Sequence, residues 1–269
     1  MGIVNATPDS FSGDGKLGQT AIDSALRMID DGADILDIGG ESTRPGADKI
    51  SVREELDRIL PLVKVLSSHS IPISVDTTKA EVAQAALEHG ASIINDVSGG
   101  TFDEKMLPLI ASSDCGFVMM HLRGTPQTMQ WSEKTTNATN DVITEIVHFW
   151  NAQIQTAIEL GIDKNCIALD PGFGFGKSIE ENLETLRRGK ELKSLGHPLL
   201  CAVSRKSTIG KVLNIENPEE RIWGSAACAA IAINNDYDIL RVHDVREMRQ
   251  VACMVDALRQ RHHPPIHAP

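Results

Sequence analysis

The chain has 269 residues, with 26 lysines and arginines against 37 aspartates and glutamates. The net charge of −11 argues against a broad basic surface for nucleic acid or for an anionic membrane, so we expect neither as a partner. The sequence contains no apolar run of about 20 residues, as a membrane span requires, and it does not start with a secretion signal. We therefore expect a cytoplasmic protein, or a mitochondrial one if the source is a eukaryote.

Short runs of β-branched and apolar residues recur along the chain, and each is followed by a segment with helical periodicity. We expect eight strands, at Gly2–Asn5, Asp34–Ile38, Ile71–Asp76, Ser92–Asp96, Gly116–Met120, Cys166–Asp170, Pro198–Val203 and Ile239–Val242. The expected helices are Ala21–Asp31, Val52–Ser67, Lys79–His89, Glu104–Ile110, Asp141–Leu160, Ile179–Gly189, Glu219–Asn234 and Val245–Gln260. Strands and helices in this alternation predict an α/β protein that forms a single (β/α)8 TIM barrel.

The barrel is expected to span residues 1–260, because no low-complexity linker divides that stretch. The tail 261–269 is rich in proline and histidine, and we expect it to be disordered. A first strand that begins at residue 2 leaves no room for the elements that usually precede a barrel. We therefore expect the chain to be part of a longer polypeptide or a shortened form of one.

Nearly every predicted strand ends at a hydrogen-bonding side chain, which is where the active sites of such barrels lie. At a single position, an ordinary turn or helix cap explains an Asp or Asn about as well as a ligand contact does. The complete set favours a lined pocket. Its members are Asn5, Asp37, Asp76, Asn95, Asp96, His121, Asp170, Ser204 to Ser207, Arg241 and His243.

The side chains of this pocket separate by charge along the chain. Strands three, four and six supply carboxylates and an amide, which suit a planar heterocycle with N–H donors: Asp76, Asn95 and Asp170. Strands seven and eight lead to cations, where barrels often bind phosphate: Lys206, Arg241 and His243. Two long loops, Ala6–Thr20 and Glu41–Ser51, contain several glycines and are plausible mobile lids.

One segment imitates a phosphate-binding loop. Gly172 to Ser178 reads GFGFGKS, but only three residues separate Gly172 from Gly176, whereas the phosphate-binding motif requires four. We therefore do not expect Lys177 to bind phosphate through that motif.

Seven motifs in order identify a family. They are NATPDSFS from Asn5, GGESTRPGA from Gly39, SVDT from Ser74, INDVSGG from Ile94, DPGFGFGK from Asp170, SRKS from Ser204 and RVHDV from Arg241. In this order the chain closely resembles the dihydropteroate synthases, from residue 2 to about 260. The resemblance implies a transferase of folate biosynthesis on a (β/α)8 barrel. Such an enzyme joins dihydropterin hydroxymethyl pyrophosphate to p-aminobenzoate with Mg²⁺ and releases pyrophosphate.

The same resemblance implies roles for individual residues. The pterin would contact Asp76, Asn95, Asp170 and Lys206, and would pack against Met119 and Phe175. Asn5 would bind Mg²⁺, while Arg241 and His243 would hold the pyrophosphate. The p-aminobenzoate would lie between Phe11, Pro45 and Lys206, with its carboxylate near Ser207. Thr43 and Arg44 belong to the second loop, which the family closes over the reaction.

The chain departs from the family pattern in the first loop. Family members commonly read FSDGG, whereas this chain has an extra Gly13 before Asp14, so the register of the loop acid Asp14 stays open. Two other functions are also open: a methyltetrahydrofolate-binding methyltransferase on a similar barrel, and a non-catalytic pterin-binding barrel. The alanine-rich segment Gly224–Ala232 permits close packing against the barrel or against a second copy, and we expect a homodimer.

Overall fold

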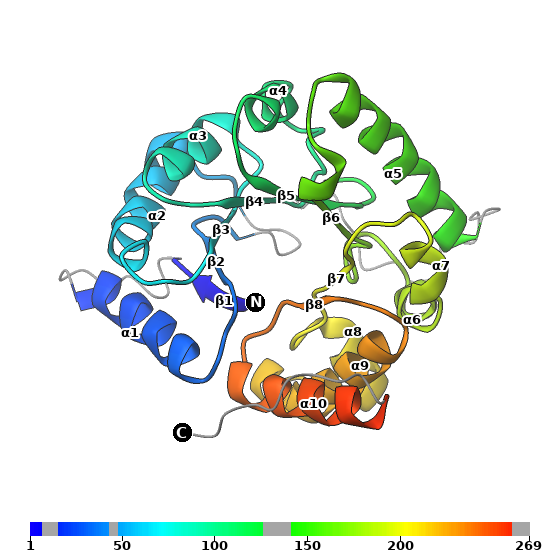
Figure 1. Cartoon of the computed structure of the whole chain (residues 1–269). Helices are drawn as coiled ribbons and strands as arrows, with labels where there is room; N and C mark the ends of the chain where they lie inside the picture. Colours follow the sequence, from blue (N-terminus) through cyan, green and yellow to red (C-terminus); the bar gives the residue numbers. More distant parts are fainter. Residues whose placement is uncertain (7–15, 43–47, 126–140, 260–269) are drawn as a thin grey trace.

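Parallel strands form a ring with helices around it in the computed structural model, which describes residues 1–6, 16–42, 48–125 and 141–259 (Figure 1). All eight predicted strands are present, each within or close to its expected range. They are β1 (Gly2–Asn5), β2 (Leu36–Gly39), β3 (Ile73–Asp76), β4 (Ile93–Asp96), β5 (Gly116–Met120), β6 (Ile167–Asp170), β7 (Leu200–Cys201) and β8 (Ile239–Leu240).

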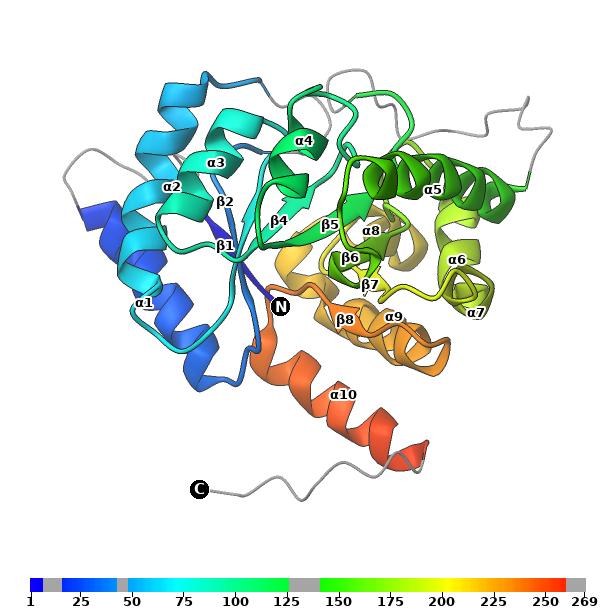
Figure 2. The same ribbon diagram turned by 45° about the horizontal axis from the view of Figure 1, so that its top comes forward.

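The ring closes through single backbone bridges between its two sheets. Strands β1 to β6 form one continuous parallel sheet, and β7 pairs with β8. Leu169 of β6 bridges to Leu199, and Gly2 of β1 bridges to Val242, so both gaps between the two sheets are joined. The amino terminus of Met1 also donates to the Leu240 carbonyl at 2.9 Å, beside β8 (Figure 2). The predicted TIM barrel is therefore confirmed.

Helices follow the strands as expected, and two short helices were not predicted. The α-helices are α1 (Lys16–Asp30), α2 (Val52–Leu66), α3 (Ala80–Glu88), α4 (Met106–Ala111), α5 (Val142–Glu159), α6 (Ile179–Arg187), α7 (Gly189–Lys193), α8 (Ser207–Leu213), α9 (Ile222–Asn234) and α10 (Val245–Leu258). The 3-10 helices are η2 (Lys164–Cys166) and η3 (Pro218–Arg221). The unpredicted helices α7 and α8 have 5 and 7 residues, too few for a clear apolar periodicity.

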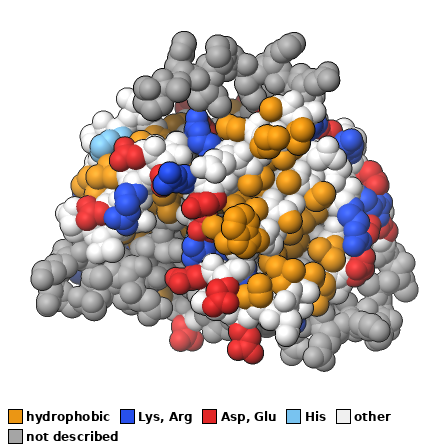
Figure 3. Space-filling model, turned by 90° about the horizontal axis from the view of Figure 1, so that it is seen from below, with side chains coloured by type: hydrophobic (Ala, Val, Ile, Leu, Met, Phe, Trp, Pro, Cys, Tyr) orange, Lys and Arg blue, Asp and Glu red, His pale blue; other side chains and the backbone are white. Residues whose placement is uncertain are grey.

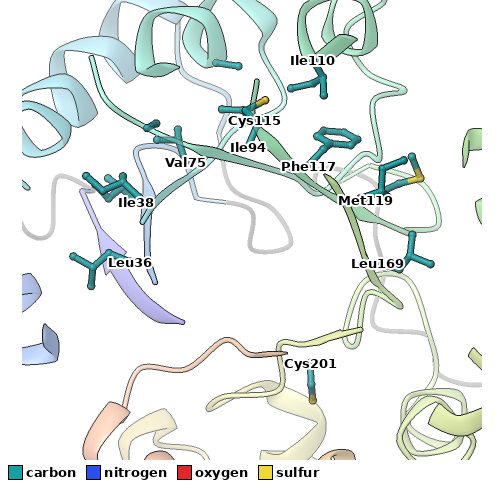
Figure 4. Close-up of a cluster of buried hydrophobic side chains, with 14 of the residues drawn as sticks. Leu36, Ile38, Val75, Ile94, Ile110, Cys115, Phe117, Met119, Leu169 and Cys201 are labelled. Carbon is teal, nitrogen blue, oxygen red and sulfur yellow. The ribbon is translucent and has the colours of Figure 1, made fainter. Parts of the chain in front are cut away.

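Side chains alternate between two cores along each strand, because successive residues of a strand point to opposite faces. One set packs between the strands and the helices and includes Leu36, Ile94 and Phe117 (Figure 4). A smaller set fills the inside of the ring and includes Val118, Leu200 and Ala202. This alternation decides which side chains at the strand ends can reach the barrel mouth.

None of the helices in the described ranges combines the length and the apolar composition that crossing a membrane requires. Residues 260–269 lie outside the described part of the chain, so the expected disorder of the tail stays a prediction.

Candidate active site

A row of interior positions runs across the carboxyl ends of the first four strands. Asn5 pairs with Gly39, Gly39 with Asp76, and Asp76 with Asn95. Partners in a parallel ladder point to the same side of the sheet, so these residues share the inner face. Asp76 and Asn95 are buried, whereas Asn5 is exposed at the end of β1. The structure thus brings the predicted amide and carboxylate groups to one end of the barrel.

Asp170 joins this row from β6, where it pairs with Met120 of β5. Its side chain is buried, and one carboxylate oxygen, Oδ1, accepts a hydrogen bond of 2.7 Å from the backbone N–H of Gly172. This bond fixes the rotamer of Asp170, and because one amide cannot use all the acceptor sites of a carboxylate, the group can still accept from a ligand.

Arg241 enters the same space from the end of β8. Its Nε lies 2.6 Å from Oδ2 of Asp37, and one terminal nitrogen, Nη2, lies 2.8 Å from Oδ2 of Asp76. The guanidinium therefore spans two carboxylates on neighbouring strands. It brings positive charge beside Asp76, the acid predicted to bind the ring. The sequence groups Arg241 only with the cations predicted to bind phosphate.

Asp37 organises this part of the pocket, although the sequence marked it only as the end of a strand. Its buried carboxylate accepts from the Ser74 hydroxyl at 2.5 Å, the Asn95 amide at 3.2 Å and Nε of Arg241. A buried charge with several donors is stabilised, and each donor is in turn held in place. The signal that could have found it is strand alternation, which puts Asp37 on the inner face with Ser74.

Lys206 lies across the mouth from these acids and is held by the loop that follows β6. Its Nζ donates to the Phe173 carbonyl at 2.6 Å and lies 4.5 Å from the centre of the Phe175 ring. The ring face attracts the cation, so the ammonium has a defined position. Lys206 and Phe175, which were each expected to contact the pterin, thus lie in direct contact with one another.

Burial changes the charge balance of this pocket. It raises the pKa of Asp76 to about 7, where Arg241 opposes the rise and Asp37 adds to it. Burial also raises the pKa of Asp170 against the attraction of Lys206, and it lowers the pKa of Lys206 to about 8 against that of Asp170. Each group is therefore sensitive to a charge that a ligand brings, as is common at functional sites.

His243 is oriented by Ser204, the first residue of the SRKS motif. The Ser204 hydroxyl accepts from the His243 backbone N–H at 3.2 Å, and it lies 3.0 Å from the ring atom Nδ1. A hydroxyl that donates to Nδ1 leaves the hydrogen of a neutral ring on Nε2. That arrangement suits donation to an anion.

Ser207 begins α8, and its buried hydroxyl has no hydrogen-bond partner among the described residues.

Met119 does not lie on the pocket side of β5. It packs with Phe117 and Leu169 in the cluster between strands and helices (Figure 4). A Cβ added to Gly99 would lie 3.2 Å from the Cγ of Met119. The next residue, Met120, shares the side of Asp170. The expected packing of the pterin against Met119 is therefore corrected to Met120: two successive methionines occupy opposite faces of one strand.

Five predicted residues lie outside the described part of the chain, so their positions stay predictions. They are Phe11, Asp14, Thr43, Arg44 and Pro45.

The described residues contain no group of three or more His, Cys, Asp or Glu side chains that could hold a metal ion. Asn5 offers one exposed amide oxygen at the end of β1. A single protein oxygen fits Mg²⁺ only if substrate phosphates and water complete the coordination, which is the usual way this ion binds in phosphate-handling enzymes. The site thus fits a Mg²⁺ that arrives with a diphosphate and does not fit a permanently bound metal.

Comparison with known proteins assigns the family of this barrel. The family model described as "Pterin binding enzyme" matches residues 1–243. The chain belongs to the pterin-binding enzyme family. Within it, the chain is 48% identical over 263 residues to the dihydropteroate synthase of Synechocystis, covering 96% of this chain and 89% of that protein.

A solved pterin-binding structure has the same fold. The dihydropteroate synthase of Clostridium difficile, crystallised in the presence of pteroic acid, superposes with a TM-score of 0.89 at 45% identity, covering 96% of this chain and 95% of that one. A folic acid synthesis protein of Schizosaccharomyces pombe is 44% identical over 266 residues, which are 96% of this chain but 36% of that protein. This pterin-binding enzyme is accordingly a folate-pathway transferase of the dihydropteroate synthase type.

Proposed function

We propose that this chain condenses dihydropterin hydroxymethyl pyrophosphate with p-aminobenzoate to form dihydropteroate and pyrophosphate. The observation that carries the proposal is the convergence of acidic and cationic side chains on one barrel mouth. Asp76 and Asp170 supply the acids, while Lys206 and Arg241 supply the cations, and each acid interacts electrostatically with both cations. A substrate with a ring rich in N–H donors and a diphosphate requires both kinds of group.

The acidic side of the pocket would recognise the pterin. Its amino group and ring N–H groups are donors, and the carboxylates of Asp76 and Asp170 are acceptors that can take two hydrogen bonds each. Asn95, fixed by its bond to Asp37, would add an amide whose orientation is already set. Phe175 and Met120 would pack against the ring, and the methionine replaces Met119 in this role.

The cationic side would receive the diphosphate. Arg241 has five N–H donors, and its bonds to Asp37 and Asp76 use two of them. The bonds hold the guanidinium still, so its remaining donors can serve phosphate oxygens without a large loss of side-chain entropy. His243 would donate to the same group through Nε2, when the Ser204 hydroxyl donates to its Nδ1.

The chemistry requires the bond between the pterin CH₂ and a diphosphate oxygen to break. An electron-rich dihydropterin can stabilise the cation that remains, so departure of pyrophosphate before attack is the expected order. Asp76 and Asp170 would offset the positive charge that develops on the ring, and Arg241 would offset the negative charge on the leaving group. The arylamine of p-aminobenzoate is itself nucleophilic, and no activated side chain is needed.

Mg²⁺ would neutralise charge on the departing diphosphate. Asn5 would hold it, together with phosphate oxygens. Since Asn5 would supply a single protein oxygen, we expect the metal requirement to depend on the diphosphate substrate and not on the protein alone. Asp14 of the first loop stays a predicted catalytic residue.

The second substrate would bind beside Lys206 and the start of α8. The buried hydroxyl of Ser207 is unpartnered among the described residues, so it can donate to the carboxylate of p-aminobenzoate. Lys206 adds a cation next to it. Phe11 and Pro45 stay predictions for the remaining walls of this subsite.

The deciding experiment measures pyrophosphate release spectrophotometrically with both substrates, and with each alone. The proposal expects release that depends on dihydropterin pyrophosphate, p-aminobenzoate and Mg²⁺ together. Methyl transfer from methyltetrahydrofolate without pyrophosphate release would favour the methyltransferase alternative. Tight pterin binding without turnover would favour a non-catalytic barrel.

We also propose a homodimer, formed through the outer faces of α9 and α10. The exposed positions of α9 include Trp223, Ala227 and Ile231, which recur every four residues and form one apolar stripe. Trp223 is 81% exposed, and Met254 and Leu258 extend the apolar surface onto α10. Hydrophobic side chains gather on the face of the molecule viewed from below in Figure 3, the side on which Figure 1 places these helices.

A helix that is apolar on all sides is normally covered on all sides by other parts of a protein. We therefore propose that a second copy of this chain covers the exposed side of α9. Light scattering should give the mass of two chains for the wild type, and the mass of one chain for the double variant Trp223→Asp with Ile231→Asp.

The predicted cytoplasmic or mitochondrial location and the predicted longer polypeptide stay proposals. The Schizosaccharomyces pombe relative, of which the match covers 36%, is an example of such a longer polypeptide.

A further inference from the structure

Lys177 is one of the largest fully buried side chains of the protein, with 1% of its surface exposed. It belongs to the segment Gly172 to Ser178, which resembles a phosphate-binding loop, but its ammonium points toward the backbone. Nζ donates to the carbonyls of Gly172 at 3.0 Å, His121 at 3.2 Å and Phe175 at 3.4 Å. Three carbonyl oxygens match the three hydrogens of an ammonium group. The group therefore fills a cage of backbone acceptors.

This cage joins two segments that are far apart in the sequence. His121 follows β5, whereas Gly172 and Phe175 belong to the loop after β6. Gly172 has φ +69°, and an added Cβ would lie 1.9 Å from the His121 carbonyl oxygen. Gly176 has φ +68°, and its Cβ would lie 2.5 Å from the Arg123 carbonyl oxygen. Both glycines allow the loop to lie directly against the end of β5.

Asn182 of α6 fixes the same loop from the other side. Its Oδ1 accepts from the Gly174 N–H at 2.7 Å. Its Nδ2 donates to the Lys177 carbonyl at 3.3 Å and to the Thr208 hydroxyl of α8 at 3.1 Å. The loop is thus tied to α8, the helix that begins directly after Lys206.

The loop presents the two groups that position Lys206. They are the Phe173 carbonyl, 2.6 Å from the Lys206 nitrogen, and the Phe175 ring, 4.5 Å from it. Lys177 and Lys206 therefore both bind the loop that contains residues 172 to 175. A change in the path of residues 172 to 176 would displace both contacts of Lys206.

We propose that Lys177 is a positioning residue whose ammonium, held by three backbone carbonyls, fixes the loop after β6 so that this loop orients Lys206 in the pterin pocket. The structural part of the proposal stands on the cage itself, and its effect on ligand binding rests on the proposed function. In this role Lys177 does not touch the substrate or its diphosphate.

The cage predicts chemical rescue, because a small cation can replace an ammonium that a substitution removes. Lys177→Ala leaves the carbonyls without their donors and leaves room for a free ammonium ion, whereas Lys177→Met fills the same space with an apolar chain. Lys190→Ala removes an exposed lysine of α7 and is the charge control. All proteins are compared at pH 6.5, below the value of about 7 to which burial lowers the pKa of Lys177.

The measurement is the dissociation constant of pteroic acid by calorimetry, with 100 mM ammonium chloride or 100 mM sodium chloride. We expect Lys177→Ala and Lys177→Met to bind about tenfold more weakly than the wild type, the loss that follows when buried acceptors lose a donor. Ammonium should recover most of the affinity of Lys177→Ala only. Wild type and Lys190→Ala should respond alike to the two salts.

Hydrogen–deuterium exchange without ligand tests the cage separately from the proposed function. The amides of residues 172–178 should exchange faster in Lys177→Ala, and ammonium should slow them again. If wild type fails to bind pteroic acid while this exchange pattern holds, the proposed function fails and the cage stands. If Lys177→Ala folds only in ammonium, that is the same rescue.

Three results would overturn the inference. One is wild-type affinity of folded Lys177→Ala, even if its melting temperature is lower, because Lys177 would then have a stabilising role only. Another is equal recovery of Lys177→Ala and Lys177→Met in ammonium, which would show a general salt effect. The third is an absence of any ammonium effect on loop exchange or folding in Lys177→Ala.

Discussion

Arg241 and Asp37 form an ion pair inside the barrel, with Nε of the arginine 2.6 Å from Oδ2 of the aspartate. Arg241 directly follows β8 and Asp37 belongs to β2, and the two residues are 204 positions apart in the chain. The pair holds the cation that we assign to the diphosphate, and the same carboxylate holds Asn95. Asp37 therefore connects both halves of the proposed substrate site.

Replacing Asp37 by Asn tests this connection. The change keeps the shape but removes the buried charge, so we expect the free energy of unfolding to fall by about 1–3 kcal/mol. Urea denaturation measures it. Asp57→Asn is the control, because its exposed pair with Arg53 spans 4.0 Å and should contribute less than about 0.5 kcal/mol. Equal midpoints for the two variants would contradict the role of Asp37.

Arg241→Ala should separate recognition of the diphosphate from recognition of the ring. We expect dihydropterin pyrophosphate to lose at least about tenfold more affinity than pteroic acid, which lacks the diphosphate. The affinity for pteroic acid should also fall somewhat, because Asp76 loses its ion pair with Arg241. Calorimetric titration of both ligands gives the ratio. Equal losses would remove Arg241 from the diphosphate site.

Asp170→Asn should lower the affinity for pteroic acid by about tenfold or more, because one charged acceptor becomes neutral. The hydrogen bond from the Gly172 N–H can persist. Asp23→Asn, at an exposed position on α1, controls for the change in net charge. Calorimetry provides the affinities and a thermal melt verifies folding. Unchanged affinity in a folded Asp170→Asn protein would rule out the assigned pterin contact.

The two adjacent methionines of β5 should give opposite results. Met119→Ala removes a fully buried side chain from the cluster between strands and helices, so we expect it to cost about 2–5 kcal/mol of stability. Met120→Ala should chiefly raise the KM for dihydropterin pyrophosphate. Denaturation and steady-state kinetics on both variants test this, and the reverse pattern would restore Met119 to the pocket.

The pH dependence of turnover should report Lys206. Burial lowers the pKa of this lysine to about 8, so its ammonium loses the proton as the pH rises through that value, far below the ordinary value of about 10.4. We expect kcat/KM to fall above about pH 8 by up to tenfold per unit. Lys206→Arg keeps its charge over this range. An alkaline decline of the same position in Lys206→Arg would assign it to another group.

The sequence alone determined the barrel and the composition of its mouth. Strand and helix periodicity is a local property, so all eight strands could be predicted to within a few residues at each end. Parallel strands bring their carboxyl ends to one edge, and this predicted that Asp76, Asn95 and Asp170 would share the mouth. The short helices α7 and α8 escaped prediction because 5 and 7 residues carry little periodicity.

Only the tertiary structure decided which side chains contact one another there. Motif order placed Met119 in the pocket, but the alternation of side chains along β5 turns it away and brings Met120 to the side of Asp170. The pairing of Arg241 with Asp37 and the carbonyl cage of Lys177 join segments that are distant in the sequence. Such contacts depend on closure of the ring, because no local pattern specifies which distant donor a buried acceptor will meet.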